Sequence, residues 1–218
     1  MTSYILDVTS VSPLSKNKPR QAIVLCHGYG GDGKDISTLA INWRRFLPDA
    51  IFLCPNAPEV CADNPRGYQW FDMTSENEEM IFEKSLAAAE KLNIFLDQVV
   101  KNFRLESSNL ALVGFSQGCM ISIQSGLPRK EQINCIIGYS GKVINQKHLM
   151  KNINSKPKIF LMHGANDTIV SPTYLLEAKE YLTKHGINAK IKMFKNCEHR
   201  IPVEGSSLGL GFLKKNLL

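Results

Sequence analysis

A serine lies between two glycines in the pentapeptide Gly114-Phe115-Ser116-Gln117-Gly118. An apolar run at residues 110–113 precedes it and predicts a buried strand, and the residues after it are compatible with a helix. On a tight turn between a strand and a helix, the hydroxyl group of a serine is lifted clear of the sheet, where a substrate can reach it. The two glycines are expected because a Cβ atom would clash where strand and helix nearly touch. The pentapeptide alone is a weak signal, so its context has to carry the prediction.

That context contains an acid and a base. A serine hydroxyl is a poor nucleophile near neutral pH and needs a base, usually a histidine that a carboxylate holds in one tautomer. After a serine of this type, the acid and then the histidine follow along the chain, each beyond the end of a strand. Asp167 follows the expected strand at 158–162, and His199 follows the one at 189–194. We therefore predict that Ser116 attacks, His199 accepts its proton and Asp167 orients His199.

Other acids and histidines lie in less suitable places. Glu177 and Glu180 belong to an expected helix and face water, and Glu198 is too close to His199 to reach beneath its ring. The remaining histidines precede the serine, end a strand, lie in a lysine-rich connection or close a helix (His27, His163, His148 and His185). A lone histidine is more often structural than catalytic, so position alone selects His199.

The attack places negative charge on the carbonyl oxygen of the substrate, and backbone N–H groups usually stabilise this charge. The sequence predicts Gln117, directly after the nucleophile, as one donor, and Tyr29, in the glycine-rich stretch 27–33, as the other. That stretch matches neither glycine-rich nucleotide-binding pattern, which argues against a nucleotide. The six cysteines show no zinc spacing, so we expect no metal site.

Composition and charge are those of an ordinary globular chain. Its 218 residues are 44% hydrophobic and 21% charged, which fits a single domain over residues 1–218. The formal charge of +6 is spread without a basic, aromatic-rich run, so no nucleic-acid partner is expected. Neither a signal peptide nor a membrane-spanning run is evident, and the cysteines suit a reducing compartment. We expect a cytoplasmic protein, monomer or homodimer, with at most transient contact with a membrane surface.

Apolar runs alternate with helical patterns along the chain. Strands are expected at 4–8 near a sheet edge, 22–26, 50–54, 110–113, 135–139, 158–162 and, again near an edge, 189–194. Helices are expected after Asp35, which is placed to cap the first, and at 76–103, after Ser116, at 172–185 and at 203–218. Three glycines weaken the helical pattern of the last segment. This alternation predicts an α/β fold, a mostly parallel central sheet with helices on both faces.

These stretches together resemble the phospholipase/carboxylesterase family of α/β-hydrolases, which includes acyl-protein thioesterases and small bacterial carboxylesterases. The resemblance is carried by His27-Gly28, Pro55-Asn56-Ala57-Pro58, Trp70-Phe71-Asp72, Gly114-Phe115-Ser116-Gln117-Gly118, Ser140-Gly141, His163-Gly164 through Asp167, and His199. It implies an α/β-hydrolase fold that cleaves acyl esters or thioesters without metal or cofactor. It also implies that Trp70 and Phe71 form part of the acyl-binding wall, although ordinary core packing explains two large aromatics equally well.

The sequence thus predicts a serine hydrolase that acts on small acyl esters, and on thioesters of S-acylated proteins. One alternative is a lysophospholipase that acts on lysolipids at membrane surfaces. Another is a non-catalytic binding module on the same fold, but the intact order of Ser116, Asp167 and His199 argues against it. A dienelactone-type hydrolase would prefer cysteine at the position of Ser116.

Overall fold

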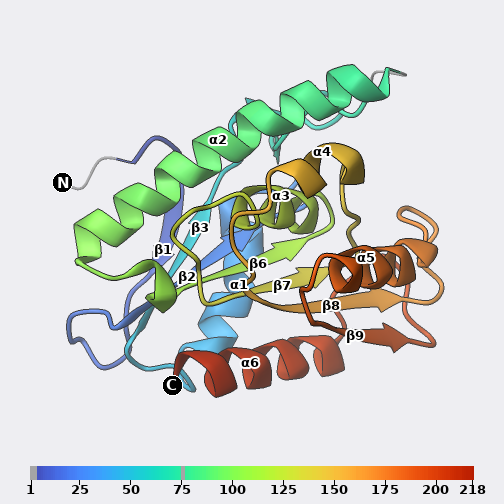
Figure 1. The fold of residues 1–218 in the computed structure, drawn as a ribbon. Coiled ribbons are helices and arrows are strands. Elements are labelled where there is room, and N and C mark those ends of the chain that lie inside the picture. Colours follow the sequence, from blue (N-terminus) through green and yellow to red (C-terminus); the bar gives the residue numbers. More distant parts are fainter. Residues whose placement is uncertain (1–3, 75–76) are drawn as a thin grey trace.

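The computed structural model describes residues 4–74 and 77–218, and among these seven strands form one central sheet (Figure 1). The strand order is β1-β3-β2-β6-β7-β8-β9. Every neighbouring pair is parallel except β1 with β3. The strands are β1 Val8–Val11, β2 Gln21–Cys26, β3 Ala50–Pro55, β6 Leu110–Phe115, β7 Cys135–Tyr139, β8 Lys158–Gly164 and β9 Ala189–Phe194. The mostly parallel sheet is therefore confirmed, with β9 at an edge as expected.

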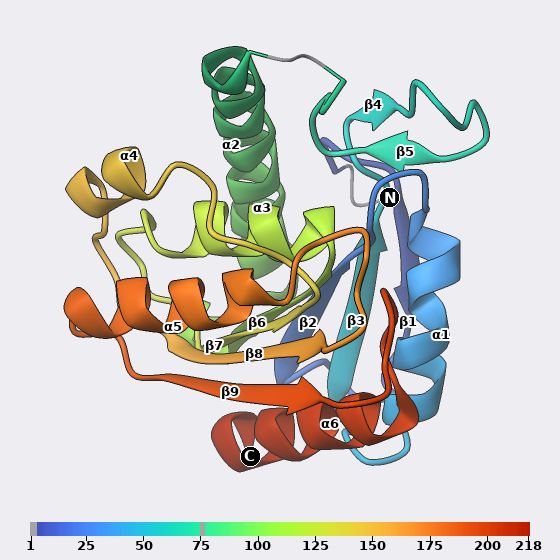
Figure 2. The same cartoon turned by 90° about the vertical axis from the view of Figure 1, so that its right-hand side faces the viewer.

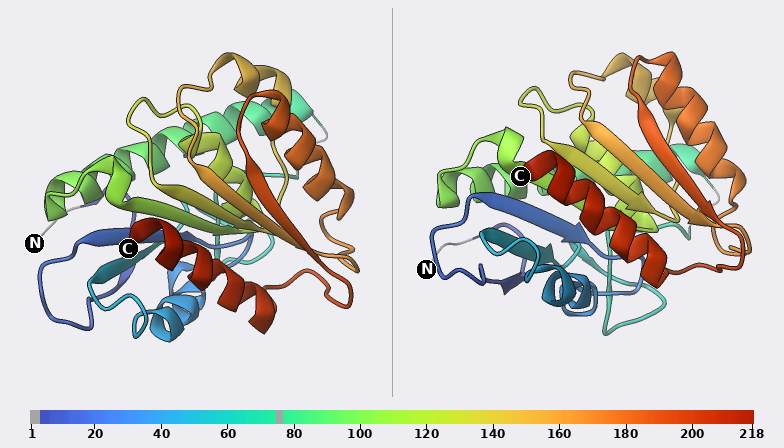
Figure 3. Two further views of the ribbon diagram at one scale, coloured as in Figure 1. Left: turned by 60° about the horizontal axis from the view of Figure 1, so that its bottom comes forward. Right: turned by 90° about the horizontal axis from the view of Figure 1, so that it is seen from below.

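Helices cover both faces of the sheet (Figures 1 and 3). On one side lie α2 Glu78–Phe103, α3 Gln117–Gly126, α4 Gln146–Lys151 and α5 Thr173–Lys184; on the other lie α1 Gly33–Trp43 and α6 Val203–Leu217. Neighbouring residues of one strand belong to opposite cores: Val24 packs with the first group of helices and Leu25 with the second. Because both faces are covered, the central strands are continuously apolar rather than alternating.

The N-terminal edge strand begins later in the chain than expected. Residues 4–8 were expected to pair, but β1 comprises Val8–Val11 and runs antiparallel to β3. The preceding apolar residues pack instead of pairing: Leu6 is buried in the core, and the ring of Tyr4 lies 5.1 Å from that of Phe95 in α2. The residues before β1 are apolar because they pack in the core, where Tyr4 contacts α2.

The cap of α1 also differs from the expectation that Asp35 provides it. The helix begins at Gly33, and the Oδ1 atom of Asp32 accepts the backbone N–H of Asp35 at 2.7 Å. Asp35 lies in the first turn, where its negative charge interacts favourably with the positive end of the helix dipole.

The long amphipathic helix ends at Phe103 as predicted, while its expected first residue, Glu76, lies outside the described residues. Within the described part of the chain, no helix is both long and apolar enough to cross a membrane. The loop before this helix contains a two-stranded ribbon, β4 Glu59–Val60 with β5 Tyr68–Gln69, which the sequence did not predict (Figure 2).

The C-terminal helix α6 forms despite its glycines, and two of them explain its close packing. A Cβ atom on Gly209 would overlap the hydroxyl group of Tyr139, and one on Gly205 would lie 3.2 Å from the ring of Phe194. The lower helix propensity of these glycines is thus offset by close approach of the helix backbone to the sheet.

Candidate active site

Ser116 lies at the turn between β6 and α3 in a strained backbone conformation, with φ 54° and ψ −118°. Residues other than glycine rarely adopt a positive φ, and those that do cluster at functional sites. A Cβ atom on Gly114 would overlap the backbone of Gly118, and one on Gly118 would overlap the carbonyl of Cys26. The steric reason predicted for both glycines is confirmed.

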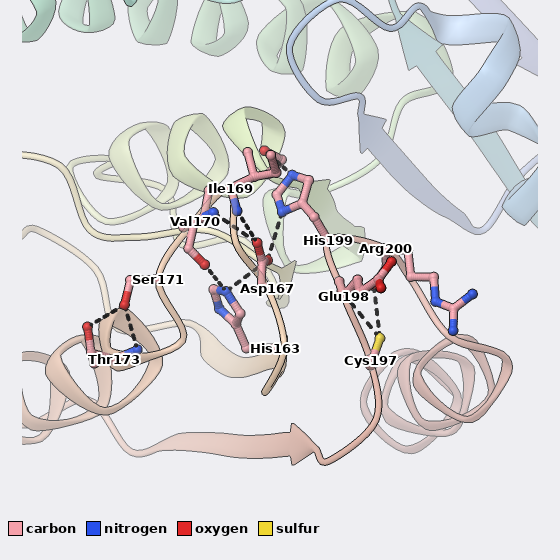
Figure 4. Close-up of polar contacts among 11 residues, drawn as sticks. His163, Asp167, Ile169, Val170, Ser171, Thr173, Cys197, Glu198, His199 and Arg200 are labelled. Carbon is pink, nitrogen blue, oxygen red and sulfur yellow. Dashed lines mark hydrogen bonds and ion pairs between the residues drawn. The ribbon is translucent and has the colours of Figure 1, made fainter.

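Three side chains from separate loops meet at the C-terminal edge of the parallel strands. Figure 4 shows two of them, Asp167 and His199, side by side. The Nε2 atom of His199 lies 2.9 Å from Ser116 Oγ, and its Nδ1 atom lies 2.7 Å from Asp167 Oδ2. Asp167 follows β8 and His199 follows β9, so the parallel sheet brings both to the edge where β6 ends. The structure therefore brings together the three residues selected from sequence order.

The carboxylate of Asp167 is completely buried and held by several donors. Its Oδ1 atom accepts the backbone N–H groups of Ile169 and Val170, both at 2.9 Å. Burial raises the pKa of this carboxyl group, but the hydrogen bonds from Val170, His199 and Ile169 outweigh it, and the net pKa lies below the usual value. Asp167 is thus ionised near neutral pH and accepts from His199 Nδ1, which leaves Nε2 free to accept from the serine.

His27 organises the glycine-rich loop on the other side of Ser116. Its Nε2 atom accepts the backbone N–H of Ala57 at 3.0 Å, so its hydrogen lies on Nδ1 and is donated to Gly28 O at 2.7 Å. Burial lowers the pKa of His27, which favours this neutral form. A Cβ atom on Gly28 would lie 3.3 Å from Ser116 Cβ, so the loop passes directly beside the serine.

The two predicted oxyanion donors flank this contact. Tyr29 follows Gly28, and no acceptor for its backbone N–H occurs among residues 4–74 and 77–218. The N–H of Gln117 belongs to the first turn of α3, where a helix offers no internal acceptor and attracts negative charge. Both groups can therefore donate to an oxyanion beside Ser116.

The side chain of Gln117 has a role that the sequence analysis missed. Its Oε1 atom accepts the N–H of Trp70 at 2.8 Å, and its Nε2 atom donates to Phe71 O at 2.6 Å. The indole N–H of Trp70 in turn donates to His27 O at 3.0 Å. These bonds tie the turn at Ser116 to the glycine-rich loop, so the spacing of the two predicted oxyanion donors depends on them. The proximity of a glutamine to a tryptophan-phenylalanine pair leaves no periodic signal in sequence.

Trp70 and Phe71 occupy different places although they are neighbours in sequence. Both are buried, but Trp70 packs against the ring of His27, at a centroid distance of 5.8 Å, whereas Phe71 lines a groove of about 620 Å³. The side chains that line the groove come from the loop after β5, from α2, α3, α4 and α5, and from the loop after β7. They are Phe71, Met73, Ile81, Phe82, Met120, Lys142, Val143, Ile144, Asn145, Gln146, Lys147, Tyr174 and Glu177.

This groove lies next to the serine. Met120 stands one helical turn beyond Ser116, and a Cβ atom on Gly141, the residue before Lys142, would lie 3.1 Å from Ser116 O. Apolar and polar side chains line the groove in similar measure, and the ammonium group of Lys142 lies 5.0 Å from the centre of the Tyr174 ring. The apolar part of the lining, which includes Phe71, Met120 and Val143, offers a surface that suits a flexible acyl group.

Comparison with known proteins gives a consistent result. The model of the phospholipase/carboxylesterase family matches residues 10–217. Acyl-protein thioesterase 1 of Schizosaccharomyces pombe is 30% identical over 200 residues, which cover 86% of this chain and 83% of that protein. Esterase YpfH of Escherichia coli is 22% identical over 204 residues, covering 92% and 85%. The crystal structure of esterase PE8 superposes with a TM-score of 0.93 at 33% identity, covering 97% of this chain and 99% of that one.

Proposed function

Because the chain belongs to the phospholipase/carboxylesterase family and is a hydrolase of the α/β-hydrolase fold, we propose that it cleaves acyl esters and thioesters through a Ser-His-Asp triad. The observation that carries the proposal is the continuous hydrogen-bonded path from Ser116 Oγ through His199 to Asp167 Oδ2. A hydroxyl group linked in this way to a fixed imidazole is the arrangement that acyl transfer to serine requires.

The proposed reaction proceeds in two halves. Ser116 Oγ attacks the carbonyl carbon of the substrate while its proton passes to His199 Nε2, and Asp167 stabilises the resulting imidazolium. The backbone N–H groups of Tyr29 and Gln117 donate to the oxyanion, each contributing about 3 kcal/mol of transition-state stabilisation. The alcohol or thiol leaves with the proton from His199, and the acyl group stays on Ser116. Water then attacks the acyl-enzyme with the same histidine as base and releases the acid.

We assign the acyl group to the groove lined by Phe71, Met120 and Val143. These apolar side chains contact the acyl chain, while buried Trp70 holds the loop of Tyr29 through its hydrogen bond to His27 O. The predicted role of Phe71 in the acyl-binding wall is thus kept as part of the proposal, and Trp70 is assigned a supporting role instead of substrate contact.

Thioesters of S-acylated proteins are proposed alongside oxyesters because several of the relatives are named acyl-protein thioesterases. The deciding measurement compares kcat/KM for p-nitrophenyl acetate, butyrate and octanoate, for an S-palmitoyl peptide and for a lysophospholipid. A preference for the peptide supports thioesterase activity, whereas a preference for the lysolipid identifies a lysophospholipase.

The triad itself is tested with Ser116→Ala and a fluorophosphonate probe. We expect this variant to lose about 10⁶-fold in kcat on p-nitrophenyl butyrate and to lose labelling, because nothing else can form the acyl-enzyme. Ser171→Ala, which changes an exposed serine beyond the turn that carries Asp167, is the matched control and should stay active and labelled. Turnover by folded Ser116→Ala at the wild-type rate, or no labelling of folded wild type, would refute the proposal.

A further inference from the structure

A second histidine contacts the carboxylate that binds His199 (Figure 4). His163 is the residue before the last in β8, and its side chain is 1% exposed. Its Nε2 atom lies 2.9 Å from Val170 O and 3.2 Å from Asp167 Oδ2. In the mechanism proposed above, His163 neither touches the substrate nor moves a proton.

The contacts of His163 determine where its ring hydrogen lies. Both neighbours of Nε2 are acceptors, a carbonyl oxygen of Val170 and a carboxylate oxygen of Asp167, so Nε2 carries the hydrogen and donates it. Its Nδ1 atom is buried, and no hydrogen-bond partner for it is found in the described part of the chain. A second proton there would bury a charge without an acceptor. Burial lowers the pKa of His163 accordingly, and the ring is a neutral donor with one fixed direction.

This donor closes the turn that carries Asp167. The N–H of Val170 donates to Asp167 Oδ1, and the carbonyl of the same residue accepts from His163. Ile169, between them, donates its N–H to Oδ1, while its side chain is 73% exposed and offers little packing. The carboxylate is therefore held at Oδ1 by backbone and at Oδ2 by two imidazole rings.

We infer that His163 is a positioning residue, which holds the turn at Val170 and the rotation of the Asp167 carboxylate so that Oδ2 faces His199 Nδ1. Without the donor, Val170 O would become a buried acceptor without a partner, and the turn would relax to satisfy it. Oδ2 would also lose one of its two donors and with it a restraint on its direction. The kinetic consequence rests on the proposed function, since a misplaced orienting group slows the chemical step rather than binding.

Three substitutions of His163 distinguish the effect of a hydrogen-bond donor at the Nε2 position from the effect of filling the space with a side chain. The amide nitrogen of glutamine reaches about as far as imidazole Nε2, whereas that of asparagine lies near Nδ1, where the structure provides no acceptor. Leucine fills the space without a donor. We expect His163→Gln to keep kcat within about three-fold of wild type, and His163→Asn and His163→Leu to lose about 10- to 100-fold with KM within about two-fold. Rates are divided by active sites counted with a fluorophosphonate, so that unfolded chains do not contribute.

The pH profile separates positioning from a loss of folded protein. The titratable groups around the His199 imidazole are Asp167, which it contacts, and His163 across the same carboxylate. A misaligned carboxylate stabilises the protonated base less, so the acid limb of kcat/KM should move to lower pH in His163→Leu and stay in place in His163→Gln. A merely structural role would leave this limb unchanged in both variants.

One readout requires no turnover. The hydrogen between His199 Nδ1 and Asp167 gives a downfield proton NMR signal, which we expect to match wild type in His163→Gln and to move or broaden in His163→Leu. If wild type hydrolyses no ester, the proposed function fails, yet this spectrum still decides whether His163 positions Asp167. An unmoved signal in folded His163→Leu, equal kcat per active site in all variants, or failure of glutamine to surpass asparagine would overturn the inference.

Discussion

The hydroxyl group of Tyr139, the last residue of β7, donates a 3.0 Å hydrogen bond to Gly205 O in α6. The backbone carbonyl of the same tyrosine accepts the N–H of Ser116 at 2.8 Å. One residue therefore connects the C-terminal helix on one face of the sheet to the turn that presents the serine. The contact is possible because Gly209, one turn further along α6, has no side chain where the hydroxyl lies.

Adding a methyl group at this contact should destabilise the chain. We expect Gly209→Ala to lower the free energy of unfolding by about 1–3 kcal/mol, because the new Cβ overlaps the Tyr139 hydroxyl. Gly211→Ala is the matched control, since nothing lies within 4 Å of a Cβ there, and it should be neutral or stabilise by up to about 1 kcal/mol. Urea unfolding measures both, and equal effects of the two variants would contradict the packing argument.

The indole N–H of Trp70 should matter for catalysis. Trp70→Phe keeps a ring but removes the donor to His27 O, which loosens the loop that carries Tyr29. We expect kcat to fall about ten-fold with a smaller change in KM, because the proposed oxyanion donor Tyr29 is then less well placed. Trp43→Phe removes a comparable bond, from Trp43 Nε1 to Ser206 Oγ at 3.0 Å on the α1 and α6 face. It should cost similar stability without lowering kcat; a loss of kcat in both variants would argue against the specific role of Trp70.

Acid should remove a stabilising contribution of Asp167. Burial opposes ionisation of this carboxyl group, but its hydrogen bonds to Val170, His199 and Ile169 lower its pKa below the unfolded value of about 3.9. The ionised form therefore stabilises the fold fully above about pH 4, and this stabilisation is lost as the pH falls toward the folded pKa. We expect the free energy of unfolding to fall more steeply below about pH 4 in wild type than in Asp167→Asn. Parallel curves in urea titrations at several pH values would contradict the linkage.

The thiol groups should be unreactive in the folded chain. All six cysteines are unpaired and buried, and burial raises the pKa of the thiols of Cys26, Cys54, Cys119 and Cys135 to about 12. The thiolate, which is the reactive form, is thus rare at pH 8. We expect a disulfide reagent to modify almost no thiol in native protein and all six in urea. In the control variant Ser171→Cys, the new thiol is exposed and should react at once. Rapid modification of the native wild type would show that the core opens readily.

The fold was predictable where local pattern and burial agree. Strands such as β2 and β6 are buried on both faces, so continuous apolar runs identify them, and the two glycines around Ser116 identify the turn. The edge strand was misplaced because apolar residues near Tyr4 serve contact with α2 instead of pairing. The short helix α4 escaped prediction because six residues are too few to show a period, and its cap, Asn145, adopts a left-handed conformation.

The site was predictable in its chain order but not in its supporting contacts. Topology alone places residues after β6, β8 and β9 at one edge, so Ser116, Asp167 and His199 could be selected without coordinates. The partners of Gln117 and His163 depend on side-chain direction in buried loops. The hydrophobic periodicity of the sequence carries no information about these directions, which depend on three-dimensional packing.

The positive φ of Ser116 has a thermodynamic consequence. A residue with a side chain in this region carries about 1–3 kcal/mol of strain, which glycine largely avoids. We expect Ser116→Gly to unfold at a higher urea concentration than Ser116→Ala, and we expect both variants to be inactive on esters. The reverse order would show that the turn is relaxed. If stability were the only requirement, glycine would be the better residue at this turn. A serine here therefore lowers the stability of the fold, and we attribute its presence to its proposed role as the nucleophile.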